Sequence, residues 1–543
     1  MLQHMAASLL AVALLWRRVS AAPVTTLEAD ILAANGNINT LTTELAPSWL
    51  TTSPVRSTAG ILWTAVTTLS LCVYTVIHLN VPPQDEKRWK FYRRKASWVL
   101  AVILAPEYAL WAAWVQWDAA RHLHNKLQKY QLAKKNETDL TEQSGRKQRE
   151  EEMDFGWTYC FFVVMGGLTV NVGDIQRNWH EPSIRSLFFS MPCDSNVELM
   201  TITPMGLCLL AECNSHLPQI SKKSIKDRSK ADNLAKLLVC VQVSWLIIQS
   251  IGRAAKGLPI ALLEIHVLAH VGCALLLYGL WFKKPLDVYE ATIVDSSRFD
   301  DELAFMLLIS QAGDMSLKEW RNAYNEDNGI TARNWLKILR GGYGLMTETP
   351  EPIKGAERAA EKLLEVWKRN DPGSDPSPLF DDSDSKPLVY QAHDVRLGTL
   401  LDQFRLISPY SGQLFPAKSS SHFFISRAMV CLTAVYAAIH LSAWRYHFPT
   451  ETEMWLWRAS SLTIAGVLPT TLFLLTIILW ISRRDISDPP MVLAVCSVSG
   501  LSLLVLVYVA ARFFLFIEAF ISVRQMPIGV FVTMQWSDYI PHI

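Results

Sequence analysis

Apolar residues in this chain of 543 residues come in long, uninterrupted blocks. About 20 apolar residues are needed to cross the hydrocarbon core of a bilayer, whereas helices of soluble proteins alternate apolar and polar faces. The pattern therefore predicts an all-α fold, a polytopic transmembrane helical bundle of about eight spans. The predicted spans are Ser57–Leu79, Ala96–Trp117, Phe155–Gly173, Leu234–Ile251, Leu258–Phe282, Ala428–His447, Ala459–Ser482 and Met491–Arg512.

The segments outside these blocks divide the chain into five regions. The insertion at 283–421 is predicted to be cytosolic and partly disordered, with amphipathic helices at 300–310 and 334–339 and a linker rich in Asp, Ser and Pro at 370–387. The five regions are a signal-like segment (1–22), a lumenal arm (23–56), transmembrane helices one to five with their loops (57–282), the soluble insertion (283–421), and helices six to eight with the C-terminal tail (422–543).

The amino-acid composition limits the classes of partner that the protein can bind. The chain has 51 Lys+Arg and 50 Asp+Glu residues, so it lacks the basic excess that a nucleic-acid-binding protein needs. The predicted partners are the lipid bilayer and a hydrophobic small-molecule substrate, with no nucleic acid. The nine cysteines lie mostly inside apolar blocks, where they pack as small hydrophobic side chains. No motif of a soluble enzyme is present, and neither a cofactor nor a metal is predicted.

Charge between the blocks predicts the orientation. The loop 80–95 carries the densest basic cluster, which places it in the cytosol and the segment 24–56 in the lumen. The segment 118–154 gives two opposite signals. Its sequon, Asn136-Glu137-Thr138, predicts glycosylation at Asn136 in the lumen, whereas its eight Lys and Arg residues indicate the cytosol. The side of the membrane on which the segment 118–154 lies therefore stays open. The chain is expected to be an integral protein of the endoplasmic reticulum or another endomembrane, or of the plasma membrane.

Candidate functional residues are the ionisable groups within the apolar blocks, because a lone charge is costly in lipid and needs a cavity or a partner. In the second block Glu107 is followed by Trp111, Trp114 and Asp118, at a spacing that puts all four on one helical face. Pro106, directly before Glu107, is expected to kink the helix at that depth.

Further candidates lie at the ends of other blocks. They are Glu264 with His266 and His270 in the fifth block, Glu518 between Arg512 and Arg524 at the end of the eighth, and His78 with Asn80 after the first. Each has a structural alternative. Glu107 could be paired with an arginine, Glu264 could cap its helix, and Asp118 could anchor a helix end. Glu518 could belong to an ion-pair network, His78 and Asn80 could form a polar cap, and the two histidines could be packed and neutral rather than metal ligands.

A carboxylic acid beside tryptophan rings has a specific chemical meaning. Apolar surroundings favour its protonated form, and the rings stabilise a carbocation while they exclude water. This combination suits protonation of an alkene or epoxide and ring closure of a polyprenyl chain. The predicted catalytic residues are Glu107, Glu264 and Asp118, and the predicted substrate contacts are Trp111, Trp114, His78, Asn80 and Glu518.

The stretch Ser224–Leu286 resembles a widespread fungal family of polytopic membrane proteins. The resemblance is carried by Asp227-Arg228-Ser229-Lys230, Gln242, Trp245, Arg253, Gly257-Leu258-Pro259-Ile260, Glu264, Trp281 and Lys284-Pro285-Leu286, and outside it by Ala105-Pro106-Glu107 and the tail from Arg512. In size and layout the chain is similar to fungal membrane-bound terpene cyclases of meroterpenoid pathways. That resemblance implies protonation-initiated cyclisation of a farnesyl-type chain in secondary metabolism.

Two other classes of function stay open. A transporter or receptor-like protein would use the same buried charges to line a solute path, although the two halves of the chain share no repeat. A membrane acyltransferase would need a histidine near an Asn or Asp deep in a helix, a requirement that His78 and Asn80 barely meet.

Overall fold

The computed structural model describes residues 24–34, 36–46, 56–82, 86–142, 155–172, 199–213, 215–229, 233–311, 351–370, 389–391, 420–482 and 491–534. Within these ranges the chain forms fifteen α-helices, two 3-10 helices and four short strands. It is therefore mostly helical, as predicted, but its small sheet corrects the expectation of an all-α fold. The signal-like segment 1–22, the helix expected at 334–339 and most of the linker at 370–387 lie outside the described residues.

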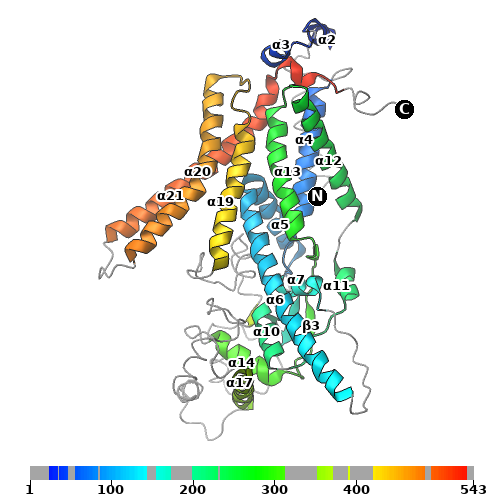
Figure 1. Cartoon of the computed structure of the whole chain (residues 1–543), viewed down its shortest axis with the longest axis vertical. Helices are drawn as coiled ribbons and strands as arrows, with labels where there is room; N and C mark the ends of the chain where they lie inside the picture. The colour runs from blue at the N-terminus through cyan, green and yellow to red at the C-terminus, as the bar shows by residue number, and fades with distance from the viewer. Residues whose placement is uncertain are drawn as a thin grey trace.

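Most of the long helices stand side by side in one bundle, from which α21 (Met491–Ile521) and the lower part of α20 (Glu451–Ser482) run obliquely away (Figure 1). The helix α13 lies at its centre, packed against α4, α6, α19 and α21, and most of its side chains are buried. The outer helices expose large apolar side chains, among them Phe473 and Leu506, as helices in contact with lipid do. The bundle consists of α4 (Thr58–Val76), α12 (Asn233–Ala255), α13 (Leu262–Leu280), α19 (Ser420–Leu441), α20 (Glu451–Ser482) and α21 (Met491–Ile521).

The two ends of the bundle are built differently. One end, here called the capped end, is covered by α2 (Val24–Ala33), α3 (Ile38–Thr43) and the C-terminal residues 522–534 (Figure 1). Backbone hydrogen bonds join these segments, from Ala46 N to Met526 O and from Ile528 N to Glu44 O. The opposite, basal end continues into a layer of shorter helices and the sheet.

The predicted second span is broken in the middle. It forms α5 (Arg88–Leu104) and α6 (Pro106–Glu142), which meet at an angle of 115°. Pro106 is the cause, because a proline lacks the amide hydrogen and excludes the helical conformation at the preceding residue. Ala105 accordingly has φ −145° and ψ 70°. The kink expected from the sequence is confirmed. It is sharp enough to turn the chain back toward the end from which α5 comes. The break between α5 and α6 is called the elbow below.

Both arms of the elbow point to the basal end. The first turns of α5 contact the segment after α13, since Lys95 is paired with Asp287 and the ring of Phe91 packs at a tilt against that of Tyr289. The other arm, α6, packs against α7 (Trp157–Val164) and α10 (Pro204–Glu212) in the basal layer. At 37 residues, α6 is about 55 Å long and extends well beyond the bundle.

The predicted third span, Phe155–Gly173, is not a membrane-crossing helix. Its helix α7 has only eight residues and ends at Val164, two residues before Gly166, whose φ of +83° favours glycine. The chain then enters strand β1 (Leu168–Asn171), rich in the β-branched residues that suit a sheet. An apolar block can thus be buried in protein instead of lipid.

The sheet joins the insertion to the rest of the protein. Its strand order is β3-β1-β2-β4, with β1 pairing antiparallel to β2 (Leu199–Ile202) and parallel to β3. The two outer strands, β3 (Thr292–Val294) and β4 (Val389–Gln391), come from the insertion. Its helices α14 (Asp300–Gln311) and α17 (Glu351–Asn370) pack together, and buried Glu302 of α14 binds Lys362 of α17 and Ser215. The helix expected at 300–310 is therefore present.

Four described helices are long and apolar enough to cross a membrane: Thr58–Val76, Leu237–Ala255, Leu262–Leu280 and Ser499–Arg524. The number becomes five if α5 and α6 together count as one broken span. A helical protein with several candidate transmembrane helices is therefore established, whereas the predicted eight spans are not reached among the described residues.

Candidate functional site

The elbow places a carboxylate in the interior of the bundle. Glu107, in the first turn of α6, forms an ion pair with Arg512 of α21 and accepts a hydrogen bond from the Tyr508 hydroxyl. The guanidinium of Arg512 is buried, donates from Nε to the same hydroxyl over 3.0 Å, and lies 4.1 Å above the ring of Tyr436. Helices α6, α19 and α21 are thus joined by one polar contact deep in the apolar core.

Three buried histidines continue this cluster. His266 Nδ1 lies 3.1 Å from His440 Nε2, and His440 Nδ1 lies 3.0 Å from the carbonyl oxygen of Tyr436. A carbonyl only accepts, so His440 carries its proton on Nδ1 and accepts on Nε2 in its neutral form. His266 must then donate from Nδ1, which leaves its Nε2 as an acceptor. The contact network therefore assigns the tautomers of both rings.

The third histidine ties α13 to the elbow. His270 Nε2 lies 2.8 Å from the carbonyl oxygen of Ile103, in the last turn of α5. The end of a helix leaves carbonyl groups without intrahelical partners, and the carbonyl of Ile103 is one that His270 contacts. His270 Nδ1 also lies 3.0 Å from the carbonyl oxygen of His266, and a neutral ring donates to one of the two. His270 is about 12 Å along α13 from its first residue and about 15 Å from its last, so the elbow lies near the middle of the bundle.

The elbow cluster, defined here as Glu107, Arg512, Tyr508, His266 and His440, is incomplete. In the part of the chain that the structure describes, Glu107 Oε2, Arg512 Nη1 and His266 Nε2 are buried without a hydrogen-bond partner. Buried polar atoms are nearly always paired, because an unpaired one loses its hydration without compensation. Glu107 and Arg512 belong to one ion pair, and His266 is linked to them through His440 and Tyr436, against whose ring Arg512 packs. Unpartnered buried atoms in such a cluster indicate a place for a water molecule or for a polar group of a ligand.

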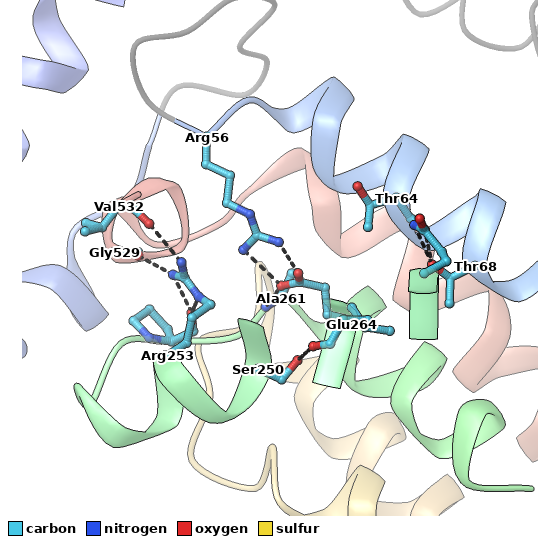
Figure 2. Close-up of polar contacts among 12 residues, drawn as sticks. Arg56, Thr64, Thr68, Ser250, Arg253, Ala261, Glu264, Gly529 and Val532 are labelled. Carbon is cyan, nitrogen blue, oxygen red and sulfur yellow. Dashed lines mark hydrogen bonds and ion pairs between the residues drawn. The ribbon is translucent and has the colours of Figure 1, made fainter. Parts of the chain in front are cut away.

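Glu264, the second predicted acid, lies at the capped end (Figure 2). Its carboxylate forms a two-pronged ion pair with Arg56 and accepts a 3.1 Å hydrogen bond from the backbone of Ala261, directly before α13. These are the contacts of a helix cap. Glu264 and Glu107 bind different arginines on different helices and do not share a site.

Arg253 completes the capped-end network that Figure 2 shows. From the end of α12 its guanidinium donates to the carbonyl oxygens of Pro259, Gly529 and Val532, over 2.6–3.1 Å. The C-terminal residues fit closely here, since a Cβ at Gly529 would lie 2.5 Å from the carbonyl oxygen of Leu41. The network therefore fastens residues 529–532 to the end of α12.

His78 and Asn80 surround a buried lysine. The ammonium group of Lys284, just after α13, donates to the carbonyl oxygen of His78 at 2.6 Å, to Asn80 Oδ1 at 3.1 Å and to Gln116 Oε1 at 2.6 Å. It also lies 4.9 Å from the ring of Trp281. Burial lowers the pKa of Lys284 well below its usual value, while the three oxygen acceptors favour the charged form. This network joins α4, α6 and α13 at the basal end.

The remaining predicted residues are dispersed. Asp118 is partly exposed and lies 3.6 Å from His122 of the same helix. Trp111 contacts Tyr108 next to the elbow, whereas Trp114 contacts Trp117 further along α6. Glu518 is buried near the ion pair of Arg524 with Glu453, and Asn136 lies in the far part of α6. The catalytic and substrate-binding roles of all these residues stay predictions.

Two important groups escaped the sequence-based prediction. His440 supplies the third histidine beside His266 and His270, but it lies 170 residues further along the chain at the end of another apolar block. Lys284 resembled an ordinary basic residue that ends a span. Its position before Pro285, within a run that ends an apolar block, gave no sign of burial. In the described part of the chain no cluster of three or more His, Cys, Asp or Glu residues has a geometry that could hold a metal.

The family of the chain is clear although its activity is not. Residues 33–321 and 419–543 match the model of a family of unknown function, DUF8562. The chain belongs to this family. The matched ranges include every residue of the elbow cluster and of the capped-end network, and they omit residues 322–418 of the insertion. Neither the curated proteins nor the solved structures contain a match.

Proposed function

We propose that this DUF8562 protein is an endomembrane enzyme that performs acid–base chemistry on a small molecule dissolved in the bilayer. The observation that carries the proposal is the incomplete elbow cluster, with an open carboxylate oxygen, an open guanidinium nitrogen and an open imidazole nitrogen. Ionisable groups in such an interior position mark functional sites in membrane proteins. A ligand that reaches them must first dissolve in the apolar surroundings.

The specific reaction we propose is protonation-initiated cyclisation of a prenyl chain in fungal secondary metabolism. Such a cyclisation begins with a proton added to an alkene or epoxide and ends with a proton removed, so the composition of the substrate is unchanged. In this scheme His266, protonated at Nε2, donates the first proton, and Glu107 Oε2 accepts the last one. Return of that proton from Glu107 to His266 restores the cluster, so the protons balance. The rings of Tyr108, Trp111, Tyr436 and Phe516 around the cluster support the proposal, because aromatic faces stabilise cations.

One feature of the cluster limits how Glu107 can act. An ion pair with Arg512 requires an ionised carboxylate, which accepts a proton more readily than it donates one. We therefore assign Glu107 to the removal of the final proton. Arg512 Nη1 is then the donor that holds the oxygen of an epoxide or hydroxyl group on the substrate.

The proposal is tested by product formation. The full chain would be expressed in a fungal host that makes farnesyl-type precursors, and lipid extracts would be compared by mass spectrometry. Glu107→Gln keeps the size of the side chain, removes the base and is expected to abolish the cyclised product. Asp301→Asn, at an exposed ion pair with Arg358 in the basal layer, is the matched control and is expected to keep it. Equal product from wild type and Glu107→Gln would exclude Glu107 from the reaction.

A carrier is the second candidate, and the broken pair α5–α6 favours it. Non-helical backbone at membrane depth occurs where it lines a cavity, and half-helices that begin there bind substrate in several transporters. Purified protein in liposomes would distinguish the two classes. A carrier moves its solute across the bilayer without altering it, whereas an enzyme changes the extracted lipid.

The proposed membrane arrangement has six crossing helices, namely α4, α12, α13, α19, α20 and α21, with α5–α6 entering and leaving at the basal end. Exposed basic residues gather at that end, and by the positive-inside rule they support a cytosolic side for it. The arrangement removes the conflict in the segment 118–154, since Asn136 then faces the cytosol and stays unglycosylated. Treatment with endoglycosidase should leave the mobility of the wild-type chain unchanged, while a sequon introduced at 442–450 should add a glycan.

A further inference from the structure

The first turns of α5 present a surface of cations and aromatic rings at the basal end. Lys87, Arg88, Lys90 and Arg93 are exposed, and Trp89 and Tyr92 between them are 55% and 46% exposed. These six residues are called the basal cationic patch. The guanidinium of Arg93 lies 5.0 Å from the ring of Trp89, so at least one cation and one ring of the patch form a joint surface.

The charge of the patch is not neutralised by the protein. The next two cations, Arg94 and Lys95, are buried and paired with Glu86 and Asp287. In contrast, the four exposed cations of the patch form no ion pair with any residue that the structure describes. Glu86 and Asp287 are thus paired with the buried side of α5, and the exposed side presents four cations without an ion-pair partner among the described residues.

The patch lies at the level where candidate spans end. Lys95, one turn further along α5, lies 4.3 Å from the ring of Tyr74, close to the last residue of α4. From the neighbouring span α13, the exposed Phe282 and Lys283 follow directly after the helix and add a ring and a cation at the same end. Aromatic rings and basic side chains at the end of a span occupy the headgroup region of a bilayer.

We propose that the basal cationic patch binds the phosphate groups of anionic lipids in the leaflet at the basal end. Lysine and arginine are the side chains that bind phosphate, and the rings beside them would enter the boundary between headgroups and acyl chains. Because α5 is one arm of the elbow, a bound headgroup would fix the position of that arm. The proposal rests on the proposed membrane arrangement, but not on the chemistry at the elbow.

The test uses the purified full chain in a mild detergent with two added lipids, phosphatidylserine and phosphatidylcholine of the same acyl chains. Native mass spectrometry would count the lipids that each protein keeps. The patch variant changes Lys87, Lys90 and Arg93 to Gln. The control variant changes Lys222, Lys223 and Lys226 to Gln, three exposed cations of α11 (Lys222–Arg228) in the basal layer.

Wild type and the control variant are expected to retain phosphatidylserine over phosphatidylcholine. The patch variant is expected to lose about tenfold or more in affinity for phosphatidylserine, because each basic residue near a membrane surface contributes independently to anionic lipid binding. The preference should also weaken as salt rises, since the charges are exposed. All substituted side chains are exposed, so the thermal unfolding temperature should stay that of wild type.

Three results would overturn the proposal. One is equal retention of the two lipids by wild type, and another is an equal loss in the patch and control variants. The third is displacement of phosphatidylserine by millimolar inorganic phosphate or by a short RNA, which would indicate a site for soluble anions. Loss of cyclisation or transport in Glu107→Gln has no bearing on these measurements, so the two proposals fail separately.

Discussion

Two buried Glu–Arg ion pairs lie in the same bundle and differ in how completely they are bonded. At the capped end, Glu264 binds Arg56 and a backbone amide, and the adjacent Arg253 donates to three backbone carbonyl groups. At the elbow, Glu107 and Arg512 bind each other and Tyr508, yet each keeps one open atom in the described structure. Only the second pair has unused hydrogen-bonding capacity.

The difference separates a structural role from a functional one. A closed network of buried charges stabilises the fold, because every desolvated atom has regained a partner. An open network destabilises the fold, because some desolvated atoms have no partner. Such sites are usually occupied by water, substrate or ions. The capped end should therefore respond to substitution in stability, and the elbow should respond in function.

The largest expected effect on stability is that of Arg253→Met at the capped end. The change leaves three buried carbonyl groups without their donor and releases the C-terminal residues, at a cost of about 3–5 kcal/mol. Thermal unfolding of the protein in detergent would measure it. Arg358→Met, at an exposed arginine of α17, is the matched control and should change stability little. If the two variants unfold at the same temperature, Arg253 does not fasten the capped end.

The ammonium group of Lys284 donates to three oxygen acceptors, its full capacity, and should therefore behave like Arg253 at the capped end. Lys284→Met removes the donor for three oxygen atoms on two other segments, and we expect a loss of about 2–3 kcal/mol. The loss is smaller than for Arg253 because Lys284 makes three hydrogen bonds and Arg253 makes four. Chemical denaturation of the two variants side by side would compare them. Unchanged stability would mean that water replaces the ammonium at no cost.

Glu264→Gln should have a moderate effect. The glutamine keeps an oxygen for the amide of Ala261 but loses the ion pair with Arg56, which is partly accessible to water and can be solvated. A loss of about 2 kcal/mol follows from one charged hydrogen bond. Arg56→Gln should cost about the same, and the double variant little more than either single one. Additive losses would show that the two residues do not act as a pair.

The smallest effect on stability is expected for His266→Gln at the elbow. His266 Nε2 has no partner among the described residues, so the substitution sacrifices one hydrogen bond to His440, or about 1 kcal/mol. Product formation should nevertheless fall as strongly as in Glu107→Gln. Activity equal to wild type, per folded molecule, would place His266 outside the functional site.

Some features of the fold could be predicted from the chemistry of single residues. The kink at Pro106 follows from the missing amide hydrogen, and the burial of Glu107 and Glu264 follows from the cost of a charge in lipid. The third span could not be excluded in the same way, because an apolar block packs equally well in lipid and against protein. Its strand forms only through pairing with residues 199–202 and 292–294, which lie far along the chain.

Which residues form the candidate site also depends on contacts between helices that are far apart in the sequence. The spacing of Glu107, Trp111, Trp114 and Asp118 correctly describes one face of one helix, but it does not say which other helices that face meets. The meeting of Glu107 with Arg512, 405 residues later, depends on the packing of α6 against α19 and α21 near the elbow. The grouping of His440 with His266 depends in the same way on the contact of α13 with α19.

If the elbow cluster receives a polar partner that the chain does not supply, that partner should be visible in a high-resolution cryo-electron microscopy map of the full chain in lipid nanodiscs. We expect density outside the protein within hydrogen-bonding distance of Glu107 Oε2, Arg512 Nη1 and His266 Nε2, and none in the capped-end network. A map in which these three atoms bond to other protein groups, with no density between them, would contradict this expectation.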